Sequence, residues 1–264
     1  MRIELNNKTA IVTGSTAGIG LAIASGLAHA GAQIIVTGRT QQRVDNAISI
    51  ITTDVPGAKV SGFAGDLGTS KGAQELINFV AEADILVNNL GIFEPKTFFD
   101  IPDEDWLRFF EVNVLSGIRL ARHYALGMAK RGWGRIQFIS SESGVQIPAE
   151  MVHYGTTKTA QLAVSRGLAE SLAGTGVTVN AILPGPTRSE GVGDFFGKIA
   201  AEKGISQEEV ERDFIATHRP TSLIKRLASV DEVANLSVYL ASEQASVTTG
   251  AAVRVDGGVV RSVV

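Results

Sequence analysis

Tyr154 and Lys158 stand four residues apart, at the start of a segment, "TAQLAVSRGLAESLAG", whose apolar residues recur at helical spacing. On an α-helix this spacing puts both side chains on one face, one turn apart. A phenol is almost fully protonated at neutral pH, but a neighbouring ammonium group stabilises the phenolate and lowers the pKa of the phenol. The pair therefore indicates an acid/base group, and the alternative is two surface residues on an amphipathic helix.

A serine is placed to join this pair. The apolar run 134–140 leads into "ISSESG", and Ser141 precedes Tyr154 by 13 residues. If the run is a strand, it delivers Ser141 to the carboxyl edge of a sheet, where open α/β sheets bind ligands. His153 could pair with Ser141 as in a catalytic triad, but its place beside a helix start favours a structural or rim role. The same site is crowded by Ser140, Glu142 and Ser143.

The elements that must position these residues alternate along the chain. The β-branched runs are too apolar for one face to be exposed to solvent, which is typical of a parallel sheet that helices cover on both sides. We expect strands at 8–14, 33–38, 59–66, 84–89, 134–140, 177–185 and 251–258, and helices near 18–30, 41–53, 70–82, 103–131, 154–174 and 230–242. This order predicts an α/β fold: one doubly wound, Rossmann-type domain over residues 1–264, with a parallel sheet of about seven strands and helices on both faces.

One interval breaks the alternation. Residues 188–227 carry no strand signal, although Ser206 and Glu209 have the spacing of a capping box that opens a short helix. Long insertions after the carboxyl end of a strand are where lids occur. We therefore expect a substrate lid at 188–227, and the alternative is a packing excursion or a subunit contact.

Composition excludes several classes of function. The chain has 264 residues, a formal net charge of −3 and no cysteine, so thiolate catalysis and disulfides are ruled out. No basic field is present to gather nucleic acid or anionic lipid. Neither a signal peptide nor an apolar stretch of about 20 residues is apparent. We expect a cytoplasmic protein without nucleic-acid or membrane partners, and the four histidines show no metal-ligand spacing.

A glycine-rich turn follows the first predicted strand. The segment "TGSTAGIG" carries Gly14, Gly18 and Gly20 and runs into a helical pattern. Glycines let the backbone turn sharply and approach a phosphate, and the N–H groups at the helix start favour its negative charge. The spacing differs from the common dinucleotide fingerprint, but the position between strand and helix supports a pyrophosphate site.

Two residues near the next strand ends concern the adenosine half of a dinucleotide. The second strand ends in "TGRTQQR", where an NAD site usually has an acid, and Gly38 with Arg39 instead suits a 2′-phosphate. The alternative for Arg39 is a solvated loop arginine. Asp66 closes the third strand and could bind an adenine amino group or cap the helix near residue 70.

Together these motifs resemble the short-chain dehydrogenase/reductase family over essentially the whole chain. The matching elements, in order, are Thr13-Gly14-x3-Gly18-Ile19-Gly20, Asp66-Leu67, Asn88-Asn89-Leu90-Gly91, Asn113, Ser141, Tyr154-x3-Lys158, Asn180 and Pro184-Gly185. Position 90 is Leu where relatives usually have Ala, so the turn beside the cofactor is bulkier.

The resemblance implies a catalytic role for four residues. Tyr154 is the general acid that protonates a carbonyl oxygen during reduction and the base in the reverse direction. Lys158 lowers the pKa of Tyr154 and binds the nicotinamide ribose. Ser141 holds and polarises the carbonyl, and Asn113 anchors a water in a proton relay from Lys158.

The resemblance also implies the cofactor site. NADP is favoured on the strength of Arg39 and the missing acid, although Ala17 stands where NADP-preferring relatives often have a basic residue; NAD stays possible. The resemblance places a contact with the nicotinamide carboxamide in the segment after Pro184-Gly185, where Thr187 and Ser189 both remain candidates. The expected cofactor residues are Gly14, Ser15, Thr16, Gly18, Ile19, Gly20, Arg39, Asp66, Leu67, Asn89, Gly91, Tyr154, Lys158, Pro184, Gly185, Thr187 and Ser189, with no metal.

The expected function is hydride transfer between NADP(H) and a medium-sized carbonyl or secondary alcohol. Alternatives are a 3-oxoacyl thioester reductase, a dinucleotide-binding sensor or scaffold without turnover, and a dehydratase or epimerase with bound NAD. The resemblance further implies a homo-oligomer, a tetramer or dimer, formed through the helices at 103–131 and 154–174. The expected substrate-facing residues are Ile92, Phe93, Glu94, Val145, Gln146, Ile147, Phe195 and Phe196.

Overall fold

A seven-stranded parallel sheet forms the centre of the molecule. The structure is a computed structural model that describes residues 2–263, with the side chains of Asp194 and Phe195 outside the description. The strand order is β3-β2-β1-β4-β5-β6-β9, and every neighbouring pair is parallel. The strands are β1 (Thr9–Val12), β2 (Gln33–Gly38), β3 (Val60–Ala64), β4 (Ile85–Asn88), β5 (Gly134–Ile139), β6 (Val177–Pro184) and β9 (Ala252–Val255).

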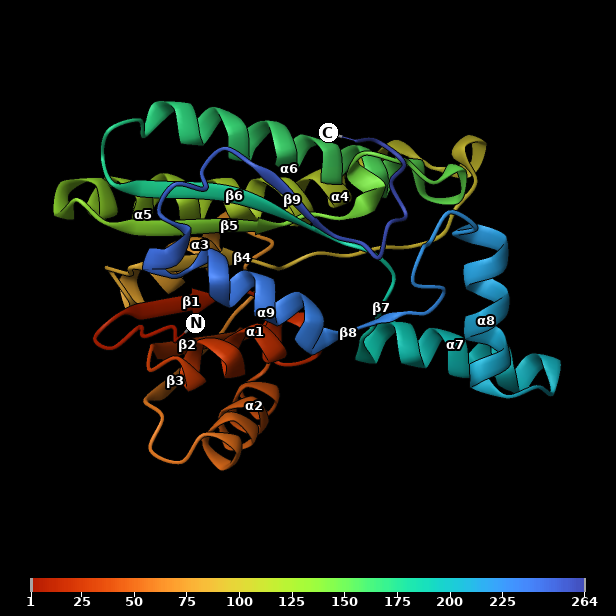
Figure 1. The fold of residues 1–264 in the computed structure, drawn as a ribbon, viewed down its shortest axis with the longest axis horizontal. Coiled ribbons are helices and arrows are strands. Elements are labelled where there is room, and N and C mark those ends of the chain that lie inside the picture. Colours follow the sequence, from red (N-terminus) through yellow and green to blue (C-terminus); the bar gives the residue numbers. More distant parts are fainter. Residues whose placement is uncertain (1, 264) are drawn as a thin grey trace.

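Apolar side chains on both faces of the sheet explain why helices cover both sides. Successive residues of a strand point to opposite faces, and in β1 Ala10 and Val12 join one buried cluster while Ile11 joins the other. One face is covered by α1 (Gly18–His29), α2 (Gln41–Asp54) and α9 (Val230–Leu240), and the other by α3 (Ser70–Phe79), α5 (Ser116–Arg131) and α6 (Val152–Ser171) (Figure 1). The predicted doubly wound fold is confirmed.

The segment predicted as one helix over 103–131 has an irregular middle. It consists of α4 (Asp103–Phe110), a π-helical turn at Glu111–Leu115 and α5. Such π-turns widen a helix locally and are frequent at functional sites. The turn carries Asn113, which is buried. Short 3₁₀ turns lie at Phe98–Asp100, Glu142–Gly144, Ala149–Met151 and Glu243–Ala245.

The insertion at 188–227 forms two helices beside the carboxyl ends of the strands (Figure 1). These are α7 (Glu190–Lys203) and α8 (Gln207–His218), and the predicted Ser206 capping box opens α8. The sequence did not indicate α7, because three glycines interrupt its pattern. Two short parallel strands, β7 (Thr187–Arg188) and β8 (Ala228–Ser229), pair where the insertion leaves and rejoins the domain. The insertion has a small core of its own, formed by Phe196, Val210, Ile215 and Leu227.

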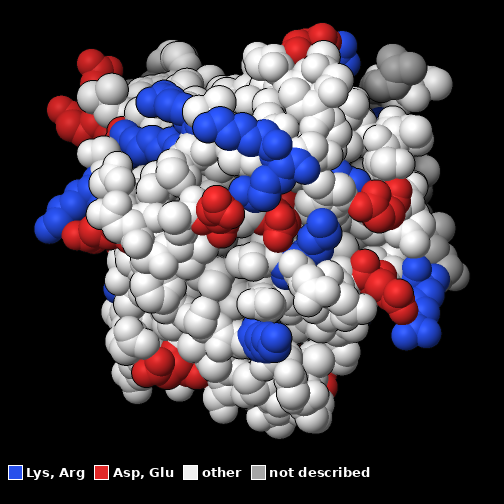
Figure 2. All heavy atoms as spheres, turned by 90° about the vertical axis from the view of Figure 1, so that its left-hand side faces the viewer, with Lys and Arg blue, Asp and Glu red and all other residues white. Residues whose placement is uncertain are grey.

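Charges of both signs occur on one face of the molecule. Figure 2 shows basic and acidic side chains interspersed on the face that lies at the left of Figure 1. Among the described residues, no helix is long and apolar enough to cross a membrane. Within residues 2–263, no group of His, Cys, Asp and Glu is arranged to hold a metal ion.

Candidate active site

The glycine turn lies where the strand order reverses, between β1 and β4. Gly14 and Gly18 adopt left-handed backbone conformations, with φ of 61° and 56°, which side chains disfavour. Gly20 is needed for close packing, since a Cβ there would lie 2.4 Å from the Gly14 carbonyl oxygen. The turn thus opens its backbone toward the start of α1, as a bound pyrophosphate requires.

Asn89 holds this turn in place from the end of β4. Its side-chain Nδ2 donates to the carbonyl oxygens of Thr13 at 2.9 Å and Gly14 at 3.1 Å. The hydroxyl of Thr13 accepts in return from the backbone N–H groups of Asn89 and Leu90. The resemblance assigned Asn89 to the adenosine side; its contacts here fix the turn that would carry the pyrophosphate.

The adenosine end of the predicted site is open. Gly38 lets Thr16 approach, since a Cβ on Gly38 would lie 2.4 Å from the Thr16 methyl group. Arg39 is exposed and forms no ion pair with the described residues. Arg43, one turn along α2, is engaged by Glu190 of α7 at 3.1 Å. Arg39 is therefore the cation left available beside this turn.

The capping alternative for Asp66 is wrong. Its carboxylate accepts from the backbone N–H of Gly68 at 3.0 Å, whereas Thr69 caps α3 by accepting from Gly72. Asp66 itself is exposed, so its carboxylate remains accessible, while the side chain of the neighbouring Leu67 packs into the core.

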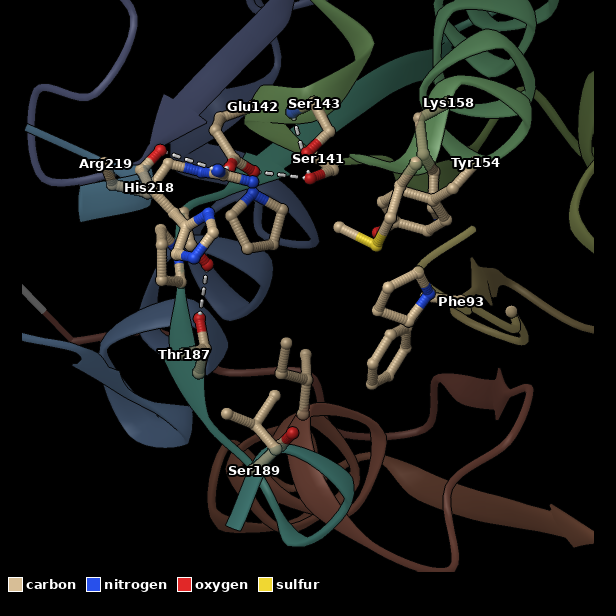
Figure 3. A pocket seen from close by; sticks show the side chains of 18 of the residues that line it. Phe93, Ser141, Glu142, Ser143, Tyr154, Lys158, Thr187, Ser189, His218 and Arg219 are labelled. Atoms are coloured by element: carbon tan, nitrogen blue, oxygen red, sulfur yellow. Dashed lines mark hydrogen bonds and ion pairs between the residues drawn. The ribbon is translucent and has the colours of Figure 1, made fainter. Parts of the chain in front are cut away.

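One pocket collects the catalytic candidates. Ser141 follows β5, and Tyr154 and Lys158 lie on the first turns of α6 (Figure 3). Residues predicted for the cofactor line the same pocket, namely Ile19, Asn89, Gly91, Pro184, Gly185, Thr187 and Ser189. Its apolar walls come from Ile92, Phe93, Met151, Val192, Phe196 and Phe214.

The predicted substrate residues divide between the pocket and the surface around it. Ile92, Phe93 and Phe196 line the pocket, and the Phe93 ring meets the Tyr154 ring edge-on with 6.4 Å between centres. The other predicted residues, Glu94, Val145, Gln146 and Ile147, are not among those that line it. Glu94 instead pairs with Arg108 at 2.8 Å. The side chain of Phe195 lies outside the described part of the chain.

Lys158 is buried and its ammonium group is directed at the backbone. Nζ donates to the Ile139 carbonyl oxygen at 2.9 Å and to Gln161 Oε1 at 3.3 Å, and it lies 5.5 Å from the centre of the Tyr154 ring. Burial disfavours the charged form and lowers the pKa of Lys158 to about 7.

The pKa of Tyr154 is raised, first by burial and then by the negative charge of Glu142. The neighbouring Ser141 hydroxyl and the Arg219 guanidinium act in the opposite direction but are outweighed. Burial acts on both groups, and the hydrogen bonds of the lysine go to the Ile139 carbonyl and Gln161 rather than to the phenol. That Lys158 lowers the pKa of the phenol stays a prediction.

Asn113 is held by a hydrogen-bond network that includes Gln161, a residue that the sequence analysis did not single out. Its side chain bonds to both backbone groups of Ile92 and to the Thr157 hydroxyl. Its backbone oxygen accepts from Gln161 Nε2 at 2.5 Å, and Gln161 Oε1 faces Lys158. The amide of Gln161 thus links Lys158 to the backbone of Asn113. The signal in the sequence is the spacing, since Gln161 follows Lys158 by three residues on one helix face.

A second missed network ties Ser141 to the insertion. Ser141 Oγ donates to Glu142 at 2.5 Å and accepts from the backbone N–H of Ser143 at 3.1 Å. Glu142 in turn accepts from Arg219 Nε at 2.8 Å. Arg219, at the end of α8, also reaches Glu150 at 3.3 Å. Figure 3 shows this chain of contacts along one side of the pocket.

The two candidates for the nicotinamide side are differently engaged. The hydroxyl of Thr187 donates to the Gly185 carbonyl oxygen at 2.9 Å. Ser189 occupies the N-cap position of α7, but its side chain makes no capping bond, and it would lie 3.2 Å from a Cβ on Gly18. The start of the insertion therefore borders the glycine turn directly.

His153 belongs to the core rather than to a triad. It is fully buried, with its ring 4.0 Å from that of Phe109 and 6.1 Å from that of Trp106, centre to centre. Burial lowers its pKa, and neither ring nitrogen has a hydrogen-bond partner among the described residues. The position agrees with the structural role that the sequence favoured.

Comparison with known proteins identifies the class. A family model described as enoyl-(acyl carrier protein) reductase matches residues 14–260. The chain belongs to the short-chain dehydrogenase/reductase family and is an oxidoreductase that uses a nicotinamide dinucleotide to interconvert carbonyl and alcohol groups.

Particular relatives cover the full length of the chain. The uncharacterized oxidoreductase YvaG of Bacillus subtilis is 48% identical over 263 residues, which is 100% of both chains. A D-beta-hydroxybutyrate dehydrogenase of Rhizobium meliloti is 35% identical, covering 95% of this chain and 98% of its own. L-Sorbose reductase from Gluconobacter frateurii, solved with NADPH and L-sorbose, superposes with a TM-score of 0.92 at 32% identity and 100% coverage of both chains.

Proposed function

We propose that this enzyme transfers a hydride between NADP(H) and a neutral, medium-sized ketone or secondary alcohol. The observation that carries the proposal is the convergence of Ser141, Tyr154 and Lys158 on one pocket that also borders the glycine turn. The dinucleotide supplies or accepts the hydride, and the pyrophosphate fits the turn that Gly14, Gly18 and Gly20 open.

The chain's own residues handle the oxygen and its proton. In the reductive direction the Tyr154 hydroxyl gives its proton to the oxygen that becomes the alcohol, and in the oxidative direction the phenolate takes it back. Ser141 holds the same oxygen. Gln161 joins Lys158 to Asn113, and these hydrogen bonds hold Lys158 in place beside Tyr154.

The charge of the pocket favours a neutral substrate. Its buried cations are already engaged: Lys158 by the Ile139 carbonyl and Arg219 by Glu142 and Glu150. A substrate carboxylate would find no free cation among the described lining residues and would face two glutamates. The apolar walls suit a hydrocarbon portion. The L-sorbose bound by a structural relative is likewise uncharged at neutral pH.

NADP preference is proposed on the basis of Arg39, which is exposed and free of ion pairs among the described residues. Relatives whose structures hold NADPH or NADP support it. We expect NADPH to bind at least about tenfold more tightly than NADH, a gap of about 1.4 kcal/mol. Fluorescence titration of the parent and of Arg39→Ala checks this, and the substitution should erase the gap.

Arg43→Ala is the matched control, because Arg43 is already paired with Glu190. If Arg43→Ala removes the preference and Arg39→Ala does not, the assignment is wrong. A panel of neutral ketones, a 3-oxo acid and a 3-oxoacyl thioester, each with NADPH, then tests the substrate class. Turnover confined to the charged acid would contradict the neutral-substrate proposal, and turnover confined to the thioester would favour the 3-oxoacyl thioester reductase instead.

The insertion at 188–227 is proposed as the substrate lid. Supporting this, α7 and α8 contribute Phe196 and Phe214 to the pocket, and Ser189 borders the glycine turn. Replacing Phe196, which is 1% exposed, would disturb the core of the insertion. Phe214→Ala, in contrast, should raise KM for an apolar ketone more than it changes cofactor affinity.

A homo-oligomer and a cytoplasmic location complete the proposal. Large apolar residues are exposed on α4 and α5, with Leu107 71% and Leu126 65% exposed, which supports association through these helices. Light scattering should give a dimer or tetramer mass, and Leu126→Glu should reduce it. The cytoplasmic location is checked by fractionation of the source cells.

A further inference from the structure

One side of the substrate pocket is polar, although most of its wall is apolar. Glu150, from the 3₁₀ turn that precedes α6, and His218 and Arg219, from the end of α8, line the same pocket as Tyr154. Figure 3 shows His218 and Arg219 across the cavity from Phe93. The proton transfer assigned to Tyr154 uses none of these three polar side chains, so they are available to recognise another part of the substrate.

Arg219 is held in place by the protein but keeps unused N–H groups. Its Nε donates to Glu142 Oε1 at 2.8 Å, and its Nη1 donates to Glu150 Oε1 at 3.3 Å and to the His218 carbonyl oxygen at 2.8 Å. A guanidinium group also has two N–H groups on its second terminal nitrogen, and no described residue accepts from Nη2 of Arg219. Because 8% of this side chain is exposed and it lines the pocket, a partner for these donors is expected from the pocket.

Glu150 and His218 add acceptor and donor positions beside Arg219. No hydrogen bond reaches Glu150 Oε2 from the part of the chain that the structure describes. His218 Nδ1 lies 3.8 Å from Glu150 Oε1, too far for a hydrogen bond, and the His218 ring stacks on that of Phe214 with 5.2 Å between centres. The side chains of Glu150 and His218 are 38% and 47% exposed, so a ligand in the pocket can reach both.

These three side chains together suit a neutral group that both donates and accepts hydrogen bonds. A carboxylate has only acceptors, so it could bind Arg219 but would be repelled by Glu150. An ammonium group has only donors, so it could bind Glu150 but would be repelled by Arg219. A ketone oxygen only accepts and leaves Glu150 Oε2 without a donor. A hydroxyl group satisfies both residues, because it has one donor and two acceptor positions.

We propose that Glu150, His218 and Arg219 form a hydroxyl-binding wall that selects a polyhydroxylated substrate, a polyol in the oxidative direction and the corresponding ketose in the reductive direction. A hydroxyl group beyond the reacting carbon donates to Glu150 and accepts from Arg219 or His218. The carbon chain packs against the apolar walls of the pocket. The inference rests on the proposed function and narrows its substrate class.

Binding is measured in a complex that cannot react, by calorimetric titration of alcohols into NADPH-loaded protein. The probes are xylitol, ribitol, D-arabinitol and 2-pentanol, which share a carbon chain of the same length. The three pentitols carry a hydroxyl group on every carbon and differ from one another only in configuration. We expect one pentitol to bind at least about tenfold more tightly than 2-pentanol, a gap of about 1.4 kcal/mol. If 2-pentanol binds as tightly as every pentitol, the proposal is overturned.

Two substitutions test the wall itself. His218→Phe keeps a ring that can stack on Phe214 but has no ring nitrogen. Glu150→Leu removes the carboxylate, while Arg219 keeps its bond to Glu142. Each substitution should reduce the ratio of pentitol to 2-pentanol affinity at least about fivefold. A merely structural role would weaken the binding of all four alcohols alike and leave this ratio unchanged.

Glu94→Leu is the matched control. Like Glu150, Glu94 is a half-exposed carboxylate paired with an arginine, but it does not line the pocket. Its substitution should leave the affinity ratio within about twofold of the parent. An unchanged ratio in both His218→Phe and Glu150→Leu, or an equal change in Glu94→Leu, overturns the proposal.

Turnover separates this inference from the proposed function. Oxidation of 2-pentanol and of the pentitols by NADP⁺ and by NAD⁺ is followed through the absorbance of the reduced dinucleotide. If no alcohol is oxidised, the proposed function fails, whereas the affinity ratios still decide whether the wall binds hydroxyl groups. If 2-pentanol is oxidised but no pentitol binds more tightly than it does, the proposed function stands and the hydroxyl-binding wall is refuted.

Discussion

The Nζ of Lys158 lies 5.5 Å from the centre of the Tyr154 ring, yet it gives its hydrogen bond to the Ile139 carbonyl, at 2.9 Å. Burial moves the pKa of the two groups in opposite directions, upward for the phenol and down to about 7 for the ammonium. Burial thus favours the protonated phenol, which is the form that gives a proton to the substrate oxygen. The charge beside it, in contrast, changes near neutrality.

Tyr154→Phe should lower kcat by roughly 10²- to 10⁴-fold, the usual contribution of a positioned general acid. NADPH affinity should stay within about threefold of the parent, because the ring and its packing against Phe93 are kept. Steady-state kinetics and cofactor titration measure the two effects. Tyr239→Phe, whose hydroxyl makes only a 3.5 Å contact with the Gln244 carbonyl oxygen, is the control that should retain the parent kcat.

The buried charge of Lys158 should make stability depend on pH. Its pKa falls from 10.5 to about 7 on folding, so between these values the unfolded chain binds the proton and the folded protein does not. Stability therefore rises with pH through that window, and the full cost of the buried charge is present below pH 7.

Lys158→Met removes this cost. Its stability relative to the parent should be most favourable below pH 7 and decline toward pH 10.5, over a range of a few kcal/mol, since one pKa unit corresponds to about 1.4 kcal/mol. Urea unfolding of the cofactor-free proteins at pH 6.5 and 9.5 gives the difference, in which packing losses that do not depend on pH cancel. An equal difference at both pH values would show that the ammonium is not desolvated.

Two glycines on helices should respond oppositely to alanine. In Gly20→Ala the new Cβ would meet the Gly14 carbonyl oxygen at 2.4 Å and Asn89 Nδ2 at 2.5 Å, so the cofactor turn must shift. We expect at least tenfold weaker NADPH binding and a lower melting temperature. Gly167→Ala on α6 meets nothing within 4 Å and should stabilise the protein by about 0.5–1 kcal/mol. Equal effects of the two changes would contradict the close packing described for the turn.

The buried His153 should lower the free energy of unfolding of the parent protein at acidic pH. Burial lowers its pKa from 6.5, so as the pH falls through 6.5 the unfolded chain takes up a proton that the folded protein resists. His153→Leu has no such proton, and its stability relative to the parent should improve between pH 7.5 and pH 5.5. Thermal unfolding at the two pH values measures the change. A constant difference would indicate that the ring is protonated within the fold.

Local patterns were sufficient to predict most of the fold and the convergence of Ser141, Tyr154 and Lys158 on one pocket. The seven strands follow from apolar runs, and the Tyr154 and Lys158 positions follow from helical spacing. The bond from Gln161 to Asn113 and the bond from Arg219 to Glu142 were missed because they join residues that are distant along the chain, 48 and 77 residues apart. No local period encodes such contacts. The burial of Tyr154 was not predicted for a related reason, since burial depends on the assembled pocket and not on the spacing of two residues.

The pairing of β7 with β8 fixes the two ends of the insertion side by side, with Thr187 opposite Ala228 and Arg188 opposite Ser229. Chain length between two ends that are already joined adds little to the entropy of loop closure, about 0.6 kcal/mol for each doubling. We therefore expect that insertions of different length can replace residues 188–227 between β7 and β8, while β5 and α6 keep their geometry. A transplant that omits an arginine equivalent to Arg219 would change the neighbourhood of Ser141 even though no residue of the sheet had been touched.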